Sequence, residues 1–393
     1  MRIRRILIFV PSVAVLVLAT VLLYNPRPPA RYRLDIKEIG PCPYSWIGQV
    51  YVNDFGQITG ICTLPTPPTP ESISPAELES IAGPSNMVQG TMQSFLWDPN
   101  SEFLLLKTTP GAQSIAQAIN NRGQVAGAWF GTDGTRHACV WDRTGERTDL
   151  ASDNIARIPT EINNLGHVIG YGGTRFTWVF YWDRDSGIVE IKPAGQGQRC
   201  FVSAINDADC VVGRMAMQGG TTHAFVWTPS SGITDLHAAF TGYTCSGAEA
   251  INDVGWVLVD CWNLGSTVDR YLYRPSDGAK RQINVPPGRC DLTLDDRGRL
   301  LCRTTEAPLT MFGGTIRDWK FSYYLIESDG TLSTLQAPVF LGGAHLLGSW
   351  RPNSRGQWAM SGTGDKESYL FIVTPIPVIL SPDAPMTPKE KVP

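Results

Sequence analysis

The sequence predicts an all-β protein, a seven-bladed β-propeller with four-stranded blades, preceded by one N-terminal transmembrane helix. Three observations predict this fold: a short pattern recurs seven times, each repeat contains several strand-like segments, and an uncharged apolar run opens the chain. Self-similarity at a period of roughly 40 to 50 residues is typical of solenoids and propellers. Four short strands in each unit favour the propeller.

The recurring pattern is an apolar residue, Asn or Asp, two variable residues, Gly and a second apolar run, as in I-N-N-R-G at Ile119–Gly123. The Asn or Asp stands at positions 53, 120, 163, 206, 252, 295 and 353. Its side chain can accept a hydrogen bond from the backbone N–H two residues on, and the Gly supplies a positive φ. Asp209 replaces this Gly in the fourth unit, and Asp tolerates the left-handed region.

We therefore interpret the pattern as a tight turn between the first two strands of each blade, not as a binding motif. A calcium loop needs oxygen ligands at alternating positions. The pairs Asn206-Asp207 and Asn252-Asp253 are adjacent instead, which disfavours bound calcium.

The fourth unit shows the strands most clearly, as F-V-S-A-I, C-V-V-G-R-M, H-A-F-V-W and I-T-D-L. These runs are rich in β-branched and aromatic residues and end at turn residues, which is typical of strands. An aromatic residue closes the third strand in the first five units, and we expect it to pack between neighbouring blades. These residues are Trp97, Trp141, Trp182, Trp227 and Tyr273.

The combination A-I-N-x-x-G-x-V-x-G followed by H-A-F-x-W resembles the HAF family of extracellular repeats in bacterial proteins. The second element reads H-A-C-V-W at His137–Trp141 and H-A-F-V-W at His223–Trp227. The resemblance extends from Ile47 to Val373 and weakens in the sixth and seventh units. It implies an exported, propeller-like repeat protein, and the family brings no established catalytic residues.

The seventh unit lacks a fourth strand, whereas Tyr32–Ile39 is a strand-like segment with no unit of its own. We predict that this segment completes the last blade, because a closed ring leaves no sheet edge exposed. The propeller would then occupy residues 32–374, followed by a disordered Pro-rich tail over 375–393.

Residues 6–24 carry no charge and are long enough to span a membrane. They follow a short basic tail, residues 1–5, and precede a linker, residues 25–31. No small-x-small cleavage site follows the run, which favours an uncleaved signal anchor over a removed signal peptide. We expect a single-pass membrane protein with its propeller on the extracytoplasmic side, in the periplasm or at the cell surface.

Cysteine positions support that location. Eight of the nine cysteines flank the Asn-x-x-Gly turns in pairs, and Cys139 is expected to be a small core residue. No C-x-x-C spacing supports a zinc site, so disulfides in an oxidising compartment are favoured. The expected strand register places Cys245 near Cys261 and Cys290 near Cys302 across the first two strands of their blades. The pairs Cys200–Cys210 and Cys42–Cys62 fit that register less well.

The net charge of −3 and the pI of about 6.0 give no sign of nucleic-acid binding. We expect a monomer without cofactor or metal that acts as a non-catalytic binding or scaffold module for a glycan or protein ligand. The loops 63–90, 237–247, 303–320 and 336–349 are long and irregular, and should share one face. Aromatic residues on or near that face are candidates for ligand contact, although they could equally cap the ring: Trp129, Trp262, Phe312 and Trp319.

Two other classes stay open. Propellers also host hydrolases and lyases that act on carbohydrates or lactones at the axial long-loop face, but the five His residues show no ligand spacing and no catalytic motif is present. A purely structural surface protein is the third reading.

Overall fold

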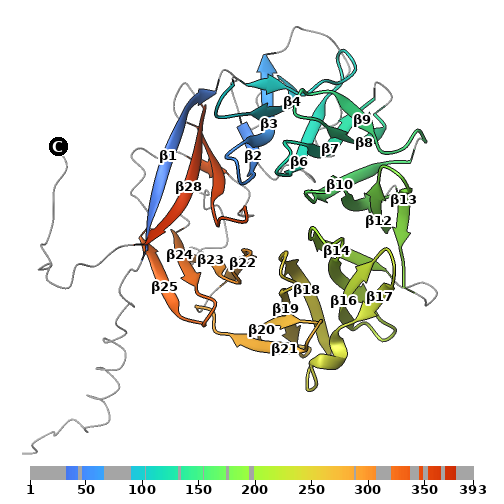
Figure 1. Ribbon diagram of the computed structural model, residues 1–393, viewed down its shortest axis with the longest axis vertical. Coiled ribbons are helices and arrows are strands. Elements are labelled where there is room, and N and C mark those ends of the chain that lie inside the picture. The colour runs from blue at the N-terminus through green and yellow to red at the C-terminus, as the bar shows by residue number, and fades with distance from the viewer. Residues whose placement is uncertain are drawn as a thin grey trace, which may run out of the picture.

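The protein is all-β and its strands surround a central axis (Figure 1). The computed structural model describes residues 32–42, 47–65, 90–101, 103–131, 134–153, 155–173, 177–193, 199–286, 289–306, 320–336, 345–347, 353–363 and 368–377. Within these ranges the sheets are built of antiparallel four-stranded groups, which confirms the predicted propeller.

The first five blades are separate four-stranded sheets, and in each the strands lie in chain order. Blade 1 contains β2 (Ile47–Val52), β3 (Ile58–Pro65), β4 (Gly90–Trp97) and β5 (Leu104–Leu105). Blade 2 contains β6 (Ser114–Ile119), β7 (Val125–Phe130), β8 (Arg136–Trp141) and β9 (Arg147–Asp149). Blade 3 contains β10 (Arg157–Ile162), β11 (Val168–Gly172), β12 (Trp178–Asp183) and β13 (Gly187–Ile191).

Blade 4 contains β14 (Cys200–Ile205), β15 (Val211–Ala216), β16 (Thr222–Thr228) and β17 (Gly232–Asp235), followed by the short 3₁₀ helix η1 (His237–Ala239). Blade 5 contains β18 (Cys245–Ile251), β19 (Val257–Trp262), β20 (Asp269–Arg274) and β21 (Ala279–Ile283).

The last two blades are joined into one eight-stranded sheet. Blade 6 contains β22 (Arg289–Leu294), β23 (Leu300–Glu306), β24 (Lys320–Ile326) and β25 (Leu332–Gln336). Blade 7 contains β26 (His345–Leu347), β27 (Trp358–Thr363), β28 (Ser368–Pro377) and the N-terminal strand β1 (Tyr32–Cys42). A short parallel contact, Tyr32 with Leu335 and Arg33 with Gln336, links the two blades.

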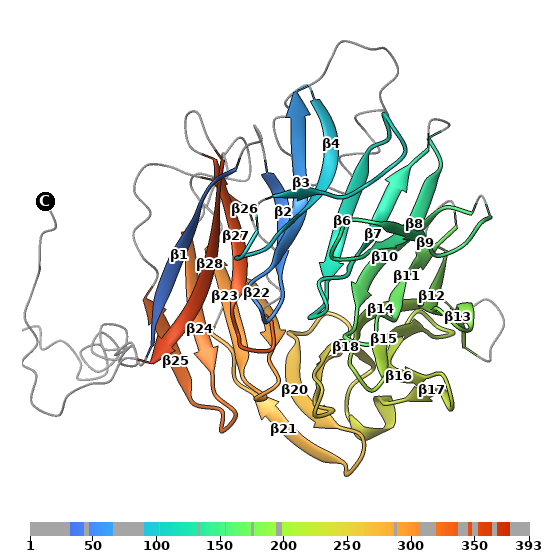
Figure 2. The same cartoon turned by 45° about the horizontal axis from the view of Figure 1, so that its top comes forward.

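The N-terminal strand closes the ring as predicted. β1 pairs antiparallel with β28 from Tyr32–Pro377 to Cys42–Ser368, so it extends three residues beyond the predicted Ile39 (Figure 2). The predicted end of the propeller at residue 374 is wrong, because β28 continues through Pro375 to Pro377. Beyond Val373, β28 no longer pairs with β27, so these two prolines need no backbone N–H on that side.

The hydrophobic core lies between blades. One cluster joins Ile169 and Tyr181 of blade 3 to Val211 and Phe225 of blade 4. The predicted packing of the aromatic row is seen at the same boundary, where the rings of Tyr181 and Trp227 lie 5.2 Å apart. Each blade therefore buries its apolar faces only against its neighbours, and the ring must be complete for every face to be covered.

No helix among the described residues is long and apolar enough to cross a membrane. The predicted membrane anchor over 6–24, its flanking segments 1–5 and 25–31, and the tail beyond Pro377 lie outside those residues. The anchor and the extracytoplasmic location stay predictions.

Removing β1 tests the closure. A chain that begins at Pro41 should lose cooperative unfolding or aggregate, because β28 becomes an exposed edge and the contact with β25 is lost. A chain that begins at Tyr32 keeps the strand and is the matched control. Urea unfolding followed by tryptophan fluorescence is the measurement, and equal unfolding midpoints for the two chains would contradict the closure.

Candidate functional site

The Asn-x-x-Gly turns gather at one end of the axis, and their residues are numbered here as turn positions 1 to 4. In blade 1 these are Asn53, Asp54, Phe55 and Gly56. The Asn53 Oδ1 accepts hydrogen bonds from the backbone N–H of Phe55 at 3.1 Å and of Gln57 at 3.0 Å. Gly56 has a φ of +76°. The turn chemistry predicted from the sequence is therefore confirmed.

The other end of the position-1 side chain joins neighbouring blades. The Asn53 Nδ2 donates to the backbone carbonyl of Asn120, the position-1 residue of blade 2, at 2.8 Å. The same bond recurs between blades 2 and 3, 3 and 4, 4 and 5, 5 and 6, and 7 and 1, at 2.9 to 3.0 Å. The seven position-1 residues are only 3% to 8% exposed. Sequence reasoning assigned these side chains to the turn alone and missed their role across the boundary.

Blade 6 departs from this scheme because its position-1 residue is Asp295. A carboxylate has no N–H to donate to Asn353 of blade 7. Asp295 instead accepts from the Arg299 guanidinium, with its Oδ2 2.7 Å from Nη2 and 2.8 Å from Nε. A buried carboxylate is stable only with such a partner, so Arg299 accounts for the charge at this boundary.

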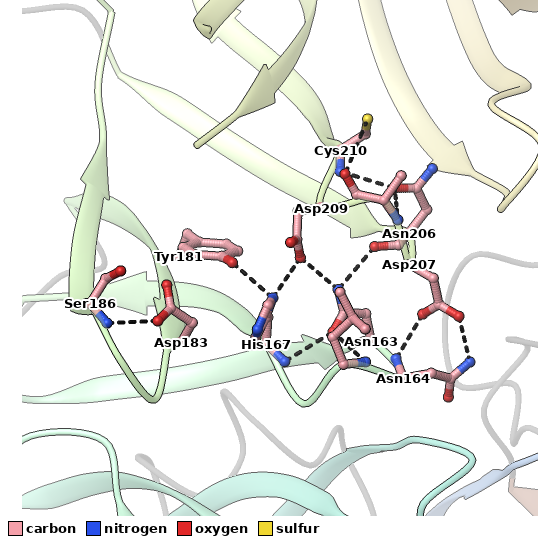
Figure 3. Close-up of polar contacts among 12 residues, drawn as sticks. Asn163, Asn164, His167, Tyr181, Asp183, Ser186, Asn206, Asp207, Asp209 and Cys210 are labelled. Carbon is pink, nitrogen blue, oxygen red and sulfur yellow. Dashed lines mark hydrogen bonds and ion pairs between the residues drawn. The ribbon is translucent and has the colours of Figure 1, made fainter. Parts of the chain in front are cut away.

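Asp209 occupies position 4 of blade 4, with a φ of +57°. Its carboxylate reaches back to blade 3, where Oδ1 lies 2.8 Å from the Asn163 Nδ2 and 2.7 Å from the His167 Nδ1 (Figure 3). The Tyr181 hydroxyl contacts the same His167 nitrogen at 2.8 Å. A glycine has no side chain to make these contacts, so the exception to the repeat latches blade 4 to blade 3.

Position 2 forms a second ring closer to the axis. The backbone N–H of Asp54 donates to the Asn121 Oδ1 at 2.9 Å, which is position 2 of the next blade. This bond recurs at every following boundary as far as blade 6, with Oδ1 acceptors from Asn164, Asp207, Asp253 and Asp296. The ring therefore fixes the carboxylates of Asp207, Asp253 and Asp296, while the Asp54 Oδ2 accepts from the Asn121 Nδ2 at 2.6 Å.

These turns surround an axial cavity of about 300 Å³ to which all seven blades contribute. Its lining includes the four position-2 carboxylates together with Glu161, Glu249 and Asp295. None of the lining residues that the structure describes is a Lys, Arg or His. Glu249 faces Arg214 at 3.9 Å and Asp295 is paired with Arg299, but none of the four position-2 carboxylates has an ion-pair partner among the described residues.

Burial and neighbouring charges raise the pKa values of two of these carboxylates. Burial raises the pKa of Asp253, and the neighbouring charges of Asp207 and Asp296 raise it further. Burial likewise raises the pKa of Asp296, with added repulsion from Asp54. Carboxylates in this state favour a nearby positive charge. Within the described ranges, however, no group of three or more His, Cys, Asp or Glu is placed to hold a metal ion.

No protein-family model matches the chain, and no curated protein is significantly similar to it. Among solved structures, the β-propeller domain of the Trilobed protease from Pyrococcus furiosus is similar with a TM-score of 0.51 and 10% identity, over 86% of this chain and 100% of that chain. An acylaminoacyl peptidase from Pyrococcus horikoshii gives a TM-score of 0.51 and 11% identity, over 82% of this chain and 52% of that chain.

Virginiamycin B lyase from Staphylococcus aureus gives a TM-score of 0.47 and 12% identity, over 86% of this chain and 99% of that chain. At such identities the two similarities with a TM-score of 0.51 show the propeller fold alone. The HAF resemblance stays a prediction.

The structure describes only two of the four aromatic candidates of the long-loop face, Trp129 and Trp262. Trp129 in blade 2 stacks on His137 with ring centroids 4.4 Å apart, and the Arg147 guanidinium lies 4.0 Å from its ring. Its Nε1 donates to Asp149 at 2.8 Å, so this ring is packed against its own blade. Trp262 is half-buried in blade 5. Phe312 and Trp319 lie outside the described residues, as do most of the long loops, and that ligand face stays a prediction.

The structure separates some of the predicted cysteine pairs and brings another together. The eight described cysteines are all free thiols in this structure. Cys245 pairs with Trp262 and Ser246 pairs with Cys261. Cys245 and Cys261 therefore point to opposite faces of the sheet, and their predicted disulfide is wrong. A β-bulge between Ala248 and Ala250 causes the shift, because it moves the register by one residue.

One further pair is also wrong. Cys200 pairs with Met215, at the opposite end of the β14–β15 pair from the turn that precedes Cys210. Cys42 lies in β1 of blade 7, where it pairs with Ser368, whereas Cys62 lies in the neighbouring blade 1, and a disulfide between them stays a prediction. Cys139 is fully buried in the core, as expected.

Cys290 and Cys302 lie on the same face of the β22–β23 pair, where Cys290 pairs with Thr304 and Leu292 with Cys302. Their Sγ atoms are 2.9 Å apart. The disulfide between them stays a prediction.

In protein isolated from an oxidising compartment, peptide mass mapping without reduction should find Cys290 linked to Cys302 and Cys245 alkylated as a free thiol. A free Cys290 in that sample would refute the pair.

Replacing Asp209 tests the latch between blades 3 and 4. Asp209→Gly removes the backbone strain of a left-handed non-glycine residue, about 1 kcal/mol. It also removes the contacts of the Asp209 carboxylate to Asn163 and His167, and a hydrogen bond to a charged group contributes about 1.5–3 kcal/mol. We expect a net loss of about 1–2 kcal/mol in the free energy of urea unfolding. Asp209→Asn keeps one acceptor and should lie between the two. A glycine variant as stable as the parent would show that the latch contributes nothing.

Proposed function

We propose that the protein is a non-catalytic binding module, and that the axial cavity at the turn end receives a cationic organic group of its ligand. The observation that carries the proposal is the charge of the described lining residues: seven are acidic, and none of those described is a Lys, Arg or His. Because low-dielectric walls focus the field of such a cleft, an ammonium or guanidinium group would be attracted into it.

The positions of the carboxylates support binding rather than proton transfer. Each position-2 Asp in blades 4 to 6 uses Oδ1 to accept a backbone N–H from the preceding blade, so its orientation is set by the ring. Fixed acceptors of this kind are preorganised for a cation. The proposal places the ligand at the turn end, opposite to the long-loop face that the sequence favoured.

A propeller hydrolase or lyase stays the alternative. Lyases, a lactonase and peptidases are among the solved structures with this fold, but at 10% to 12% identity they carry no information about chemistry in this chain. Such an enzyme would place its chemistry on the long-loop face.

The cavity is tested with a double variant, Asp253→Asn with Asp296→Asn. Asn stands naturally at position 2 in blades 2 and 3 and makes the same Oδ1 contact, so the ring is kept while two charges are removed. We expect the variant to bind N-acetyl-argininamide at least about 10-fold more weakly in calorimetry, which corresponds to about 1.4 kcal/mol. Its neutral citrulline analogue should not bind the parent protein.

The control is Asp185→Asn, which removes one exposed charge outside the cavity lining. Binding of the citrulline analogue as tight as that of argininamide would rule out charge recognition.

Stability provides a second check, because the raised pKa values mean that ionised Asp253 and Asp296 cost stability at neutral pH. The double variant should therefore unfold at the same or a higher urea concentration than the parent.

Acidification should weaken binding earlier than ordinary carboxylates allow. Burial and like charges raise the pKa values of Asp253 and Asp296 above the usual 3.8, so both carboxylates become neutral at a higher pH than an exposed Asp. Argininamide affinity should fall as the pH is lowered from about 7, before the pH reaches 3.8, and binding should release protons. Affinity that is constant down to that pH would contradict the role of these two residues.

A further inference from the structure

Position 3 of the turns forms an exposed rim around the axial cavity. It directly follows the cavity-lining position 2 in each blade, and all seven position-3 residues are exposed. Phe55 is 64% exposed, Leu165 is 44% exposed and Val254 is 56% exposed. Blade 4 has Ala208 there, and the other three blades have Arg122, Arg297 and Arg355.

The exposed apolar residues of this rim are not needed by the turn. The turn uses the backbone of position 3, whose N–H donates to the position-1 Oδ1, as in Phe55, Arg122 and Leu165. Phe, Arg, Leu, Ala and Val therefore all fit the same turn. Of the eight large apolar side chains exposed among the described residues, three stand at this one position, around one cavity. Clustered apolar exposure of this kind marks an interaction surface.

We propose that the turn end of the propeller docks a loop of a partner protein that inserts one Arg or Lys into the axial cavity and packs apolar neighbours on Phe55, Leu165 and Val254. The inference rests on the proposed cation-binding role of the cavity and adds the class of partner. Charge complementarity argues for the basic side chain, since seven of the described lining residues are acidic.

The rim argues for a protein rather than a small polyamine. A polyamine would gain nothing from three exposed apolar side chains, whereas a peptide can place an apolar residue on each side of its Arg or Lys. Arg122 reaches across the rim to the Leu165 carbonyl at 3.3 Å, so the basic side chain of blade 2 adjoins the apolar position of blade 3. The three arginines fit acidic or carbonyl groups at the periphery of the same loop.

The experiment selects random dodecapeptides displayed on phage against the full-length protein. Enriched peptides should carry Arg or Lys flanked by apolar residues, and synthetic copies should lose at least about 10-fold in affinity for Phe55→Ala with Val254→Ala. Alanine is already present at this position in blade 4, so the turns should keep their fold. Leu264→Ala is the control, because Leu264 is 77% exposed but lies in the β19–β20 connection at the other end of the axis.

The two proposals fail separately. If the rim variant binds the selected peptides as the parent does while the Asp253→Asn, Asp296→Asn variant does not, the rim proposal is wrong and the cavity proposal stands. If both variants bind N-acetyl-argininamide and the peptides unchanged, both proposals are wrong. If no peptide is enriched on the parent relative to the rim variant, protein docking at this face is refuted.

Other occupants give other results, and each would overturn the proposal. A Phe55-dependent dimer in analytical ultracentrifugation would assign the face to a second copy of this chain. Tighter peptide binding after removal of residues 378–393 would assign it to the chain's own C-terminal segment. Unchanged argininamide binding by the rim variant is expected in every case, since Phe55 and Val254 are absent from the cavity lining.

Discussion

The hydrogen bond from each turn asparagine to the carbonyl of the next blade is the constraint on which the rest of the structure depends. The position-1 side chain satisfies its own turn through Oδ1 and the neighbouring blade through Nδ2, as Asn53 does with Phe55 and Asn120. Because these amides are buried, an unsatisfied one would cost about 1–3 kcal/mol. Blade spacing is therefore set by a polar contact at the axis as well as by apolar packing further out, and the cavity lining inherits that spacing.

The two departures from this scheme place charge at blade boundaries. Asp295 cannot donate, and Arg299 compensates it; a Cβ on Gly356 of blade 7 would lie 3.2 Å from the Arg299 Nη2, so the guanidinium lies over the next turn. Asp209 adopts the left-handed conformation less easily than a glycine would, but its carboxylate contacts Asn163 and His167. An ion pair thus replaces the repeating amide at the boundary of blades 6 and 7, and a carboxylate replaces the repeating glycine at the boundary of blades 3 and 4.

Much of the fold could be predicted because its signals are local or periodic. The Asx turns, the left-handed Asp209 and the closing strand from Tyr32 follow from residue chemistry and from one missing strand. Cross-strand register could not be predicted, because a bulge leaves no sequence mark. Blades 1 to 5 have a register shift in their first strand and blade 6 has none, which is why Cys245 misses Cys261 while Cys290 meets Cys302. The axial cavity was missed because its lining comes from residues about 43 apart that meet only in the closed ring.

The four positions of the turn thus have different roles. Positions 1 and 4 are almost uniform along the chain, since one must bridge blades and the other must adopt a positive φ. Positions 2 and 3 bear no such restriction: position 2 needs only an oxygen acceptor in most blades, and Asn and Asp supply it equally well. Asp stands at four of the seven places: the Oδ2 atoms of Asp54 and Asp207 accept from the Asn121 and Asn164 side chains, whereas burial makes the charges of Asp253 and Asp296 costly. A costly charge that the fold does not require is most simply explained by a ligand that neutralises it, and the exposed apolar residues at position 3 lie where such a ligand would extend.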